Sequence, residues 1–209
     1  MTLDTWFIYV ATVLALMSTP GPSQLLMLSN SARNGFRRGT ATAFGDLTAN
    51  AIQMLLAGLG LGAVLAASAG SLLIIKWLGV AYLLFLGIKM IRKSRIQENA
   101  DSQPQTRDSL KSLWLQGFLT SAANPKAVVF FAALFPQFID PGIAIASQLI
   151  ILSVTYLIID AIFLSIYGIS ASWIAEKLKG NTRTYIDRVG GSFVIAAAIL
   201  LGVKTVGER

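Results

Sequence analysis

The chain of 209 residues contains no cysteine and no histidine. Without cysteine it forms no disulfide and performs no thiol redox chemistry, and without either residue it has no Cys/His metal site and no histidine acid–base catalyst. Aspartate and glutamate can still bind a hard cation, but no clustered carboxylate motif is present. ATP-binding and Gly-x-Ser-x-Gly motifs are absent too. We therefore expect no metal, no cofactor and no enzymatic activity.

Charged residues are also scarce, at 13% of the chain, whereas a soluble domain usually has roughly 25%. Hydrophobic residues make up 55%, and the mean hydropathy is +0.66. This composition predicts an integral membrane protein. The net charge of +7 could suggest a nucleic-acid partner, but the basic residues stand in short loops between apolar runs. That placement is typical of membrane topology, so the expected partner is the lipid bilayer and not nucleic acid.

Six apolar runs are each close to the roughly 20 residues that a membrane-spanning helix needs. The first has no basic segment before it and is too long for a signal peptide, so we expect it to be retained as a helix. We predict an all-α membrane protein with six transmembrane helices, at residues 5–29, 40–67, 72–91, 113–135, 145–172 and 188–206.

Basic residues gather in alternate loops of this arrangement. The N-terminus and the second and fourth loops have none. The positive-inside rule then places the basic loops in the cytoplasm and both termini on the outer, periplasmic side, although Lys204 and Arg209 weakly oppose this. The basic residues of the first, third and fifth loops are Arg33, Arg37 and Arg38; Arg92, Lys93, Arg95, Arg107 and Lys111; and Lys177, Lys179, Arg183 and Arg188.

The third loop divides the single membrane domain into two halves. Residues 1–94 form the first three-helix repeat, residues 95–112 a polar cytoplasmic linker, and residues 113–209 the second repeat. Because three spans are an odd number, the halves enter the membrane from opposite sides, as in a 3+3 inverted-topology repeat. Each half begins with a helix that is broken near the middle of the membrane, at Pro20-Gly21-Pro22 and at Asn124-Pro125-Lys126.

A broken helix frees backbone N–H and C=O groups, which can hold a carboxylate or an ammonium group. Lys126 lies too deep in its span to reach either surface, so we expect it to face the bundle interior with a carboxylate or carbonyl partner. It could anchor a substrate carboxylate. The alternatives are that Lys126 forms a structural ion pair and that the breaks are kinks that only shape packing.

Polar residues form stripes on three predicted helices, at the spacing that places them on one helix face. We predict that the stripes converge on one polar cavity, although interhelical hydrogen bonding is an alternative. The stripes comprise Asp46, Asn50 and Gln53 in the second span; Gln116, Thr120 and Asn124 in the fourth; and Ser153, Tyr156 and Asp160 in the fifth.

Three ionisable residues are expected deep in the membrane: Asp46, Lys126 and Asp160. Two carboxylates against one ammonium group leave a net charge of −1, which one proton would neutralise. This count suggests proton coupling. A zwitterionic substrate would place its carboxylate at Lys126 and the broken-helix N–H groups, and its ammonium at Asp46 or Asp160. A passive channel or facilitator for small solutes is the alternative, and an intramembrane enzyme has little support.

Several stretches of the chain resemble the LysE/RhtB family of amino-acid exporters. The resemblance implies a small exporter of amino acids or their derivatives in the bacterial inner membrane, driven by protons, and leaves the substrate and a homodimer open. The stretches are Ser18–Ser23, Asn34–Gly39 with Gly45-Asp46, Lys76–Gly87, Asn124–Ala127 with Phe130-Phe131 and Pro136–Phe138, and Arg188–Gly191 with Gly202–Lys204. The predicted substrate-binding or coupling residues are Pro20, Gly21, Pro22, Asp46, Asn50, Gln53, Asn124, Pro125, Lys126, Tyr156 and Asp160.

Overall fold

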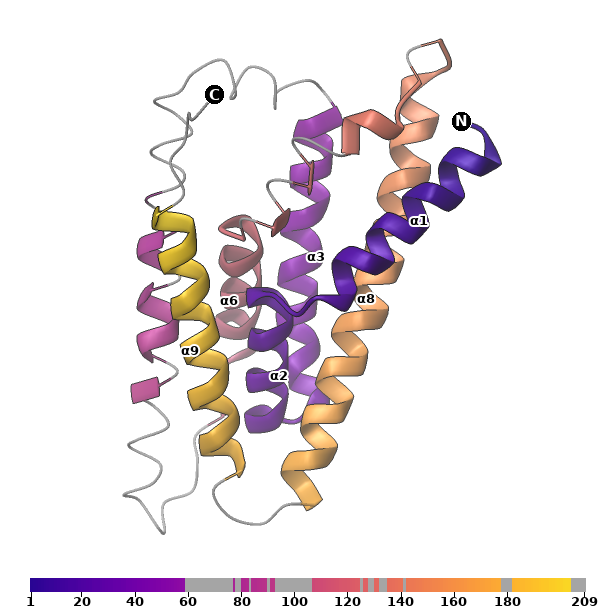
Figure 1. The fold of residues 1–209 in the computed structure, drawn as a ribbon. Helices are drawn as coiled ribbons and strands as arrows, with labels where there is room; N and C mark the ends of the chain where they lie inside the picture. Colours follow the sequence, from indigo (N-terminus) through magenta and orange to yellow (C-terminus); the bar gives the residue numbers. More distant parts are fainter. Residues whose placement is uncertain are drawn as a thin grey trace.

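The computed structural model describes residues 1–58, 77, 80–82, 84–89, 91–92, 107–124, 126–127, 130–131, 135–140, 142–177 and 182–203. Within these ranges the chain is helical and contains no strand (Figure 1). The predicted all-α fold is therefore confirmed. The elements are α1 (Leu3–Ser18), α2 (Pro22–Asn34), α3 (Phe36–Gly58), α6 (Leu110–Ala122), the short 3-10 helix η2 (Phe135–Phe138), α8 (Ile145–Lys177) and α9 (Thr182–Val203).

Among the described residues, α8 is the one helix that is long and apolar enough to cross a membrane by itself. Helices α1 and α2 meet the same criteria as a pair, bent by 56° at their break. The count of six spans and the inverted repeat stay predictions, because parts of the second and third spans lie outside the described residues. Helix α8 exposes an apolar face suited to lipid, with Ile150, Ile158, Ile162, Ile166 and Ile169 at the surface.

The first basic loop is shorter than the sequence suggested. Helix α2 continues to Asn34 and α3 begins at Phe36, so Gly35 alone forms the corner. Its φ of 80° is a backbone conformation that glycine adopts without steric cost. The basic residues of this segment therefore stand on helix ends. Arg38 is half-buried and donates a hydrogen bond to the backbone carbonyl of Asp108 at 2.7 Å, so it links two segments.

Other helix boundaries differ modestly from the expected spans. Helix α6 begins at Leu110, ahead of the expected Leu113, because the Ser109 hydroxyl accepts the backbone N–H of Ser112 and caps the helix. Helix α8 extends to Lys177 and α9 begins at Thr182, so the ends of both carry polar residues. Lys204 and the turn expected between the second and third spans lie outside the described residues.

Helices α3 and α6 cross in backbone contact. A Cβ atom at Gly45 would overlap the Trp114 carbonyl, and one at Gly117 would overlap the Thr42 carbonyl. Small residues permit such close approach between membrane helices. This crossing brings Asp46, which follows Gly45 on α3, to the last turn of α6.

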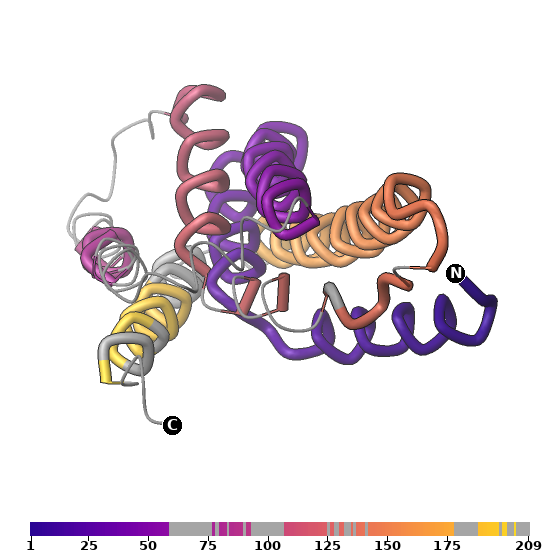
Figure 2. Tube along the Cα trace, turned by 90° about the horizontal axis from the view of Figure 1, so that it is seen from above, coloured from indigo at the N-terminus to yellow at the C-terminus, as the bar shows by residue number. Residues whose placement is uncertain are grey.

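A cluster of buried aromatic side chains joins α1 to α8 and the segment between α6 and η2. It contains Tyr9, Phe130, Phe131, Phe135 and Tyr156. The Tyr9 hydroxyl also donates a hydrogen bond to the Leu152 carbonyl of α8 at 3.0 Å. Seen from above, α1 runs along the side of the bundle where α8 lies, and α9 stands on the opposite side (Figure 2). The break between α1 and α2 therefore lies between these two sides.

Candidate functional site

At the first helix break, the C-terminal end of α1 is followed directly by the N-terminal end of α2. Helix α1 ends at Ser18, and α2 begins with Pro22 after Gly21. Proline suits the first position of a helix, because its missing N–H would have no helical partner there. The backbone N–H of Gly21 is bonded to the Gln24 side-chain oxygen at 3.0 Å. Gly21 and Pro22 are buried, whereas Pro20 is exposed.

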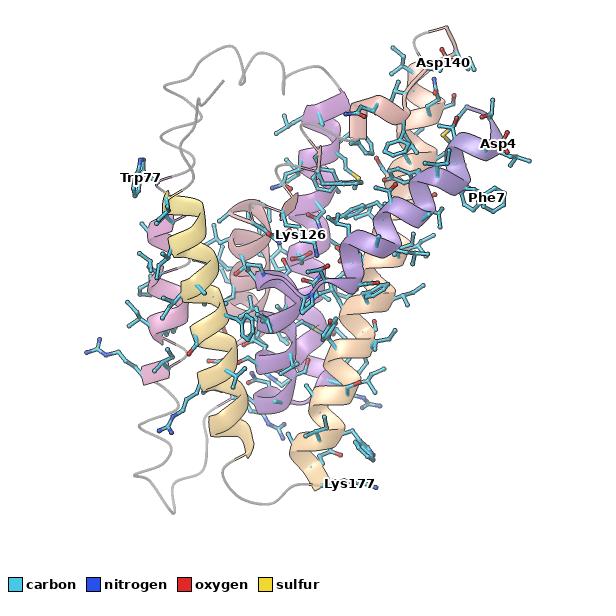
Figure 3. The ribbon with its side chains drawn as sticks, in the orientation of Figure 1. Asp4, Phe7, Trp77, Lys126, Asp140 and Lys177 are labelled. Carbon is cyan, nitrogen blue, oxygen red and sulfur yellow. The ribbon has the colours of Figure 1, made fainter. Side chains whose placement is uncertain are left out.

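The second break, after α6, likewise consists of a helix end followed by a capped helix start. After α6 ends at Ala122, the side-chain oxygen of Asn124 accepts the backbone N–H of Lys126 at 3.1 Å. This is the bond of a helix N-cap, and residues 126 and 127 are helical. Pro125 lies outside the described residues. Figure 3 shows Lys126 about midway between the bundle ends that Asp140 and Lys177 mark.

The two breaks touch each other. The Lys126 ammonium donates a hydrogen bond to the backbone carbonyl of Thr19, which the first break has freed. The Asn124 amide donates to the Ser23 hydroxyl at 3.4 Å. Lys126 is half-buried, and within the described residues its ammonium is hydrogen-bonded to this carbonyl and to neither Asp46 nor Asp160. The Lys126 ammonium at the second break therefore satisfies a backbone carbonyl that the first break leaves without a helical partner.

A buried pair of carboxylates shares one amide group. The Asn50 amide nitrogen donates to Asp46 Oδ1 at 2.9 Å and to Asp160 Oδ2 at 2.8 Å. The Ser121 hydroxyl donates to the Asn50 oxygen at 2.8 Å. Asp46, Asn50 and Asp160 are each only 2% exposed. The second carboxylate oxygen of Asp46, Oδ2, is buried and has no hydrogen-bond partner within the described part of the chain, which is costly unless a proton or a ligand occupies that position.

The carboxylate pair and Lys126 line the same cavity. Its volume of about 10 Å³ leaves room for about one water molecule. The three predicted stripes thus meet in part: each of the three helices contributes to one polar cavity. The lining residues are Leu16, Met17, Ser23, Gln24, Asp46, Asn50, Ser121, Asn124, Lys126, Ala127, Tyr156 and Asp160.

Some predicted site residues lie outside this lining. Gln53 donates to the carbonyl oxygens of Ser121 and Ala122 at 3.3 and 3.4 Å, so it satisfies the C-terminal end of α6. Gln116 donates to Ser112 and accepts from Asn30, nearer the other end of α6. The residues Pro20, Gly21 and Pro22 form the break and not the cavity wall.

Several residues that line the cavity were not among the predicted site residues. Ser23 and Gln24 open α2, and Ser121 stands in the last turn of α6. Ser23 was visible as the last residue of the motif Ser18–Ser23, but a serine beside a proline carries no distinctive signal. Ser121 does not belong to the stripe that contains Thr120 and Asn124. Within the described part of the chain, no group of three or more acidic residues could hold a metal ion.

Paired helix breaks around a small charged cavity, in a bundle with an exposed apolar face, are typical of secondary transporters. The family model described as LysE type translocator matches residues 14–205. The chain belongs to the LysE type translocator family, and it is accordingly a translocator and not an enzyme.

Curated relatives cover nearly the whole chain. The homoserine/homoserine lactone efflux proteins of Salmonella typhi and of Salmonella typhimurium are each 33% identical over 207 residues, which is 98% of this chain and 99% of each relative. An uncharacterized membrane protein of Pseudomonas aeruginosa is 35% identical over 206 residues, 96% of this chain and 94% of that protein. No solved structure matches the chain.

Proposed function

We propose that the chain exports an amino acid or an amino-acid derivative across the bacterial inner membrane in exchange for protons. The family is a family of translocators, and two relatives of nearly equal length are named for the efflux of homoserine and its lactone. Homoserine and its lactone are therefore the first substrates to test. The observation that carries the mechanism is the unpartnered carboxylate oxygen of Asp46 in a cavity that Lys126 also lines.

The cavity offers both charges that a zwitterion requires. The substrate ammonium would bind Asp46 Oδ2, which is buried without a donor. The substrate carboxylate would bind the ammonium of Lys126 in place of the Thr19 carbonyl. Helix α2 begins beside this position, with Ser23 and Gln24 in the lining, and the positive end of its dipole favours a carboxylate there.

Proton coupling follows from the carboxylate pair. Asp46 and Asp160 are held by one amide group, so two negative charges would stand close together in a buried site if both were ionised. One proton on the pair relieves their repulsion and balances the remaining carboxylate against Lys126. A proton and a substrate ammonium then compete for the same oxygen of Asp46, and this competition links their movements in opposite directions.

Substrate binding requires the cavity to widen. A space for about one water molecule is too small for an amino acid. The contacts between the two breaks, from Lys126 to Thr19 and from Asn124 to Ser23, hold three of the lining residues in place. Separation of these contacts would open the cavity, so the two breaks would act as the moving parts of the site.

We also propose the membrane arrangement predicted from the sequence: two inverted three-helix halves joined by the linker at residues 95–112, with both termini on the outer side. The N-terminus and Asp140 lie at one end of the bundle, and Lys177 lies at the other (Figure 3). Arg33 and Arg107 line one cavity together with Glu176, next to Lys177 on α8. This basic end would face the cytoplasm.

The function is tested in proteoliposomes with L-homoserine and a pH gradient. The wild type should concentrate homoserine against its gradient, and a protonophore should abolish this. Asp46→Asn and Asp160→Asn should each lose the response to the pH gradient, whereas Thr48→Val, an exposed change on the same helix as Asp46, should keep it. Intact proton-driven transport in both aspartate variants would refute proton coupling at the pair. A rate of homoserine transport that the protonophore does not change would indicate a passive facilitator instead.

Lys126→Ala supplies the test of the substrate contact. Counterflow exchange of homoserine needs substrate binding and no proton gradient, so the variant should lose exchange as well as accumulation. Exchange equal to that of the wild type would remove Lys126 from the binding site.

A further inference from the structure

Helix α2 is polar and buried, which is unusual beside lipid. Ten of its 13 residues are buried. A bilayer cannot satisfy polar side chains, so a buried polar helix in a membrane protein packs against protein or lines a water-filled path. The buried polar residues of α2 are Ser23, Gln24, Ser29, Asn30, Ser31 and Asn34.

Three cavities follow one another along α2. The central cavity touches its first turn at Ser23 and Gln24. A second cavity of about 20 Å³ is lined by Ser29, Asn30 and Arg33 of α2, together with Leu86, Lys89, Asp108 and Gln116. A third, of about 280 Å³, lies at the helix end and is lined by Ala32, Arg33, Asn34, Gly35, Arg107, Ser172 and Glu176. Arg33 lines both the second and the third cavity, so it stands between the mouth and the interior. At 1.5 Å per residue it lies about 15 Å along the helix from Ser23.

The frame of the outermost cavity is fixed by hydrogen bonds. The Ser172 hydroxyl of α8 accepts the backbone N–H of Phe36 at 3.3 Å, which ties α8 to the start of α3. The Asn34 side chain accepts the backbone N–H of Asp108 at 2.9 Å and donates to the Asp108 carboxylate at 3.4 Å. These bonds connect four segments around the cavity, and the exposed side chains of Arg107 and Glu176 complete its lining.

The lining of this cavity is complementary to a zwitterion. Arg33 and Arg107 provide guanidinium groups, which bind carboxylates in a bidentate manner. Glu176 provides the carboxylate that an ammonium group requires. A simple anion would meet the two arginines alone and a simple cation Glu176 alone, whereas a zwitterion can bind groups of both signs. A volume of about 280 Å³ is slightly below the range of roughly 300–1,000 Å³ typical of sites for drug-sized ligands, and this suits a smaller molecule.

We propose that this cavity is a first binding site for the exported amino acid at the cytoplasmic mouth, in which Arg33 binds the substrate carboxylate and Glu176 binds its ammonium. Arg33 then transfers the substrate toward the central cavity along α2. The proposal rests on the proposed function, because it assigns a second station to the same substrate.

The test measures uptake of L-homoserine and of homoserine lactone by inside-out membrane vesicles with an acidic lumen, whose outer surface is the cytoplasmic face. The lactone keeps the amine and lacks the free carboxylate. Arg33→Gln should raise the KM for homoserine about tenfold, leave the KM for the lactone nearly unchanged, and change kcat less than twofold. Glu176→Gln should raise the KM for both compounds, and Arg33→Lys should restore part of the affinity.

Arg37→Gln is the matched control, because Arg37 is exposed near the same corner and lines neither cavity. If Arg33→Gln has the same KM values as Arg37→Gln, or raises the KM for both substrates equally, the assignment of Arg33 is refuted. If only kcat falls, Arg33 has a structural or gating role and the proposal is wrong. A wild type that moves neither compound would refute homoserine and its lactone as substrates and, with them, this assignment of the site.

Discussion

Replacement of Asn50 by leucine should weaken both the fold and the transport activity. Leucine has a similar size but cannot donate to Asp46 and Asp160 or accept from Ser121. A hydrogen bond to a charged group contributes about 1.5–3 kcal/mol and one to a neutral group about 1 kcal/mol, so with one proton on the pair the loss of both bonds costs about 2.5–4 kcal/mol. If about 3 kcal/mol of this raises the barrier to transport, the rate falls about 150-fold.

Two assays check this prediction. Thermal unfolding of the purified protein reports the stability, and homoserine accumulation in proteoliposomes under a pH gradient reports the activity. Thr48→Val on the exposed side of α3 should leave the melting temperature unchanged and the rate of homoserine accumulation within a factor of two of the wild-type rate. A second comparison uses Asp160→Asn as the background, where one charged partner of the amide is gone. The cost of Asn50→Leu should be smaller there by at least about 1 kcal/mol. An Asn50→Leu variant with wild-type melting and rate would refute the reasoning.

Two other predictions concern the end of α6 and the membrane topology. Gln53→Leu should lower the melting temperature, because two hydrogen bonds to α6 carbonyls are lost at about 1 kcal/mol each. The KM for substrate should stay unchanged. A changed KM with a normal melting temperature would place Gln53 in the binding site instead. Because the chain has no cysteine, a single cysteine reports topology cleanly. A membrane-impermeant maleimide should label Gly142→Cys in intact cells, and Lys177→Cys only after lysis. The reverse pattern would invert the proposed orientation.

The parts of the site that could be predicted from the sequence are those that violate the apolar pattern. A lysine and a proline inside a membrane span are rare and costly, and so Asn124-Pro125-Lys126 was visible without a structure. The i, i+4 spacing of Asp46 and Asn50 likewise placed both on one face of a helix. Both residues lie in the same cavity, and the amide of one contacts the carboxylate of the other.

The remaining features depend on how helices are aligned in depth, which the periodicity of one helix does not encode. Gln53 shares a face with Asp46, yet it lies farther along α3, where it meets the end of α6 rather than the cavity. The partner of Lys126 is a backbone carbonyl, and a carbonyl has no signature in the sequence. The lining by Ser23 and Gln24 depends on the 56° bend that turns α2 toward the bundle. The first loop was overestimated because a single glycine can turn the chain.

The amide of Asn50 has a mechanical consequence. Asp46 and Asn50 stand on α3, which touches the backbone of α6 at Gly45, whereas Asp160 stands on α8. The carboxylate pair is therefore divided between α3 and α8. If a movement of α8 relative to α3 changes the proton affinity of the pair, thermodynamic linkage requires that proton binding bias this movement by the same free energy. The protonation state of the pair and the spacing of α3 and α8 would then be coupled.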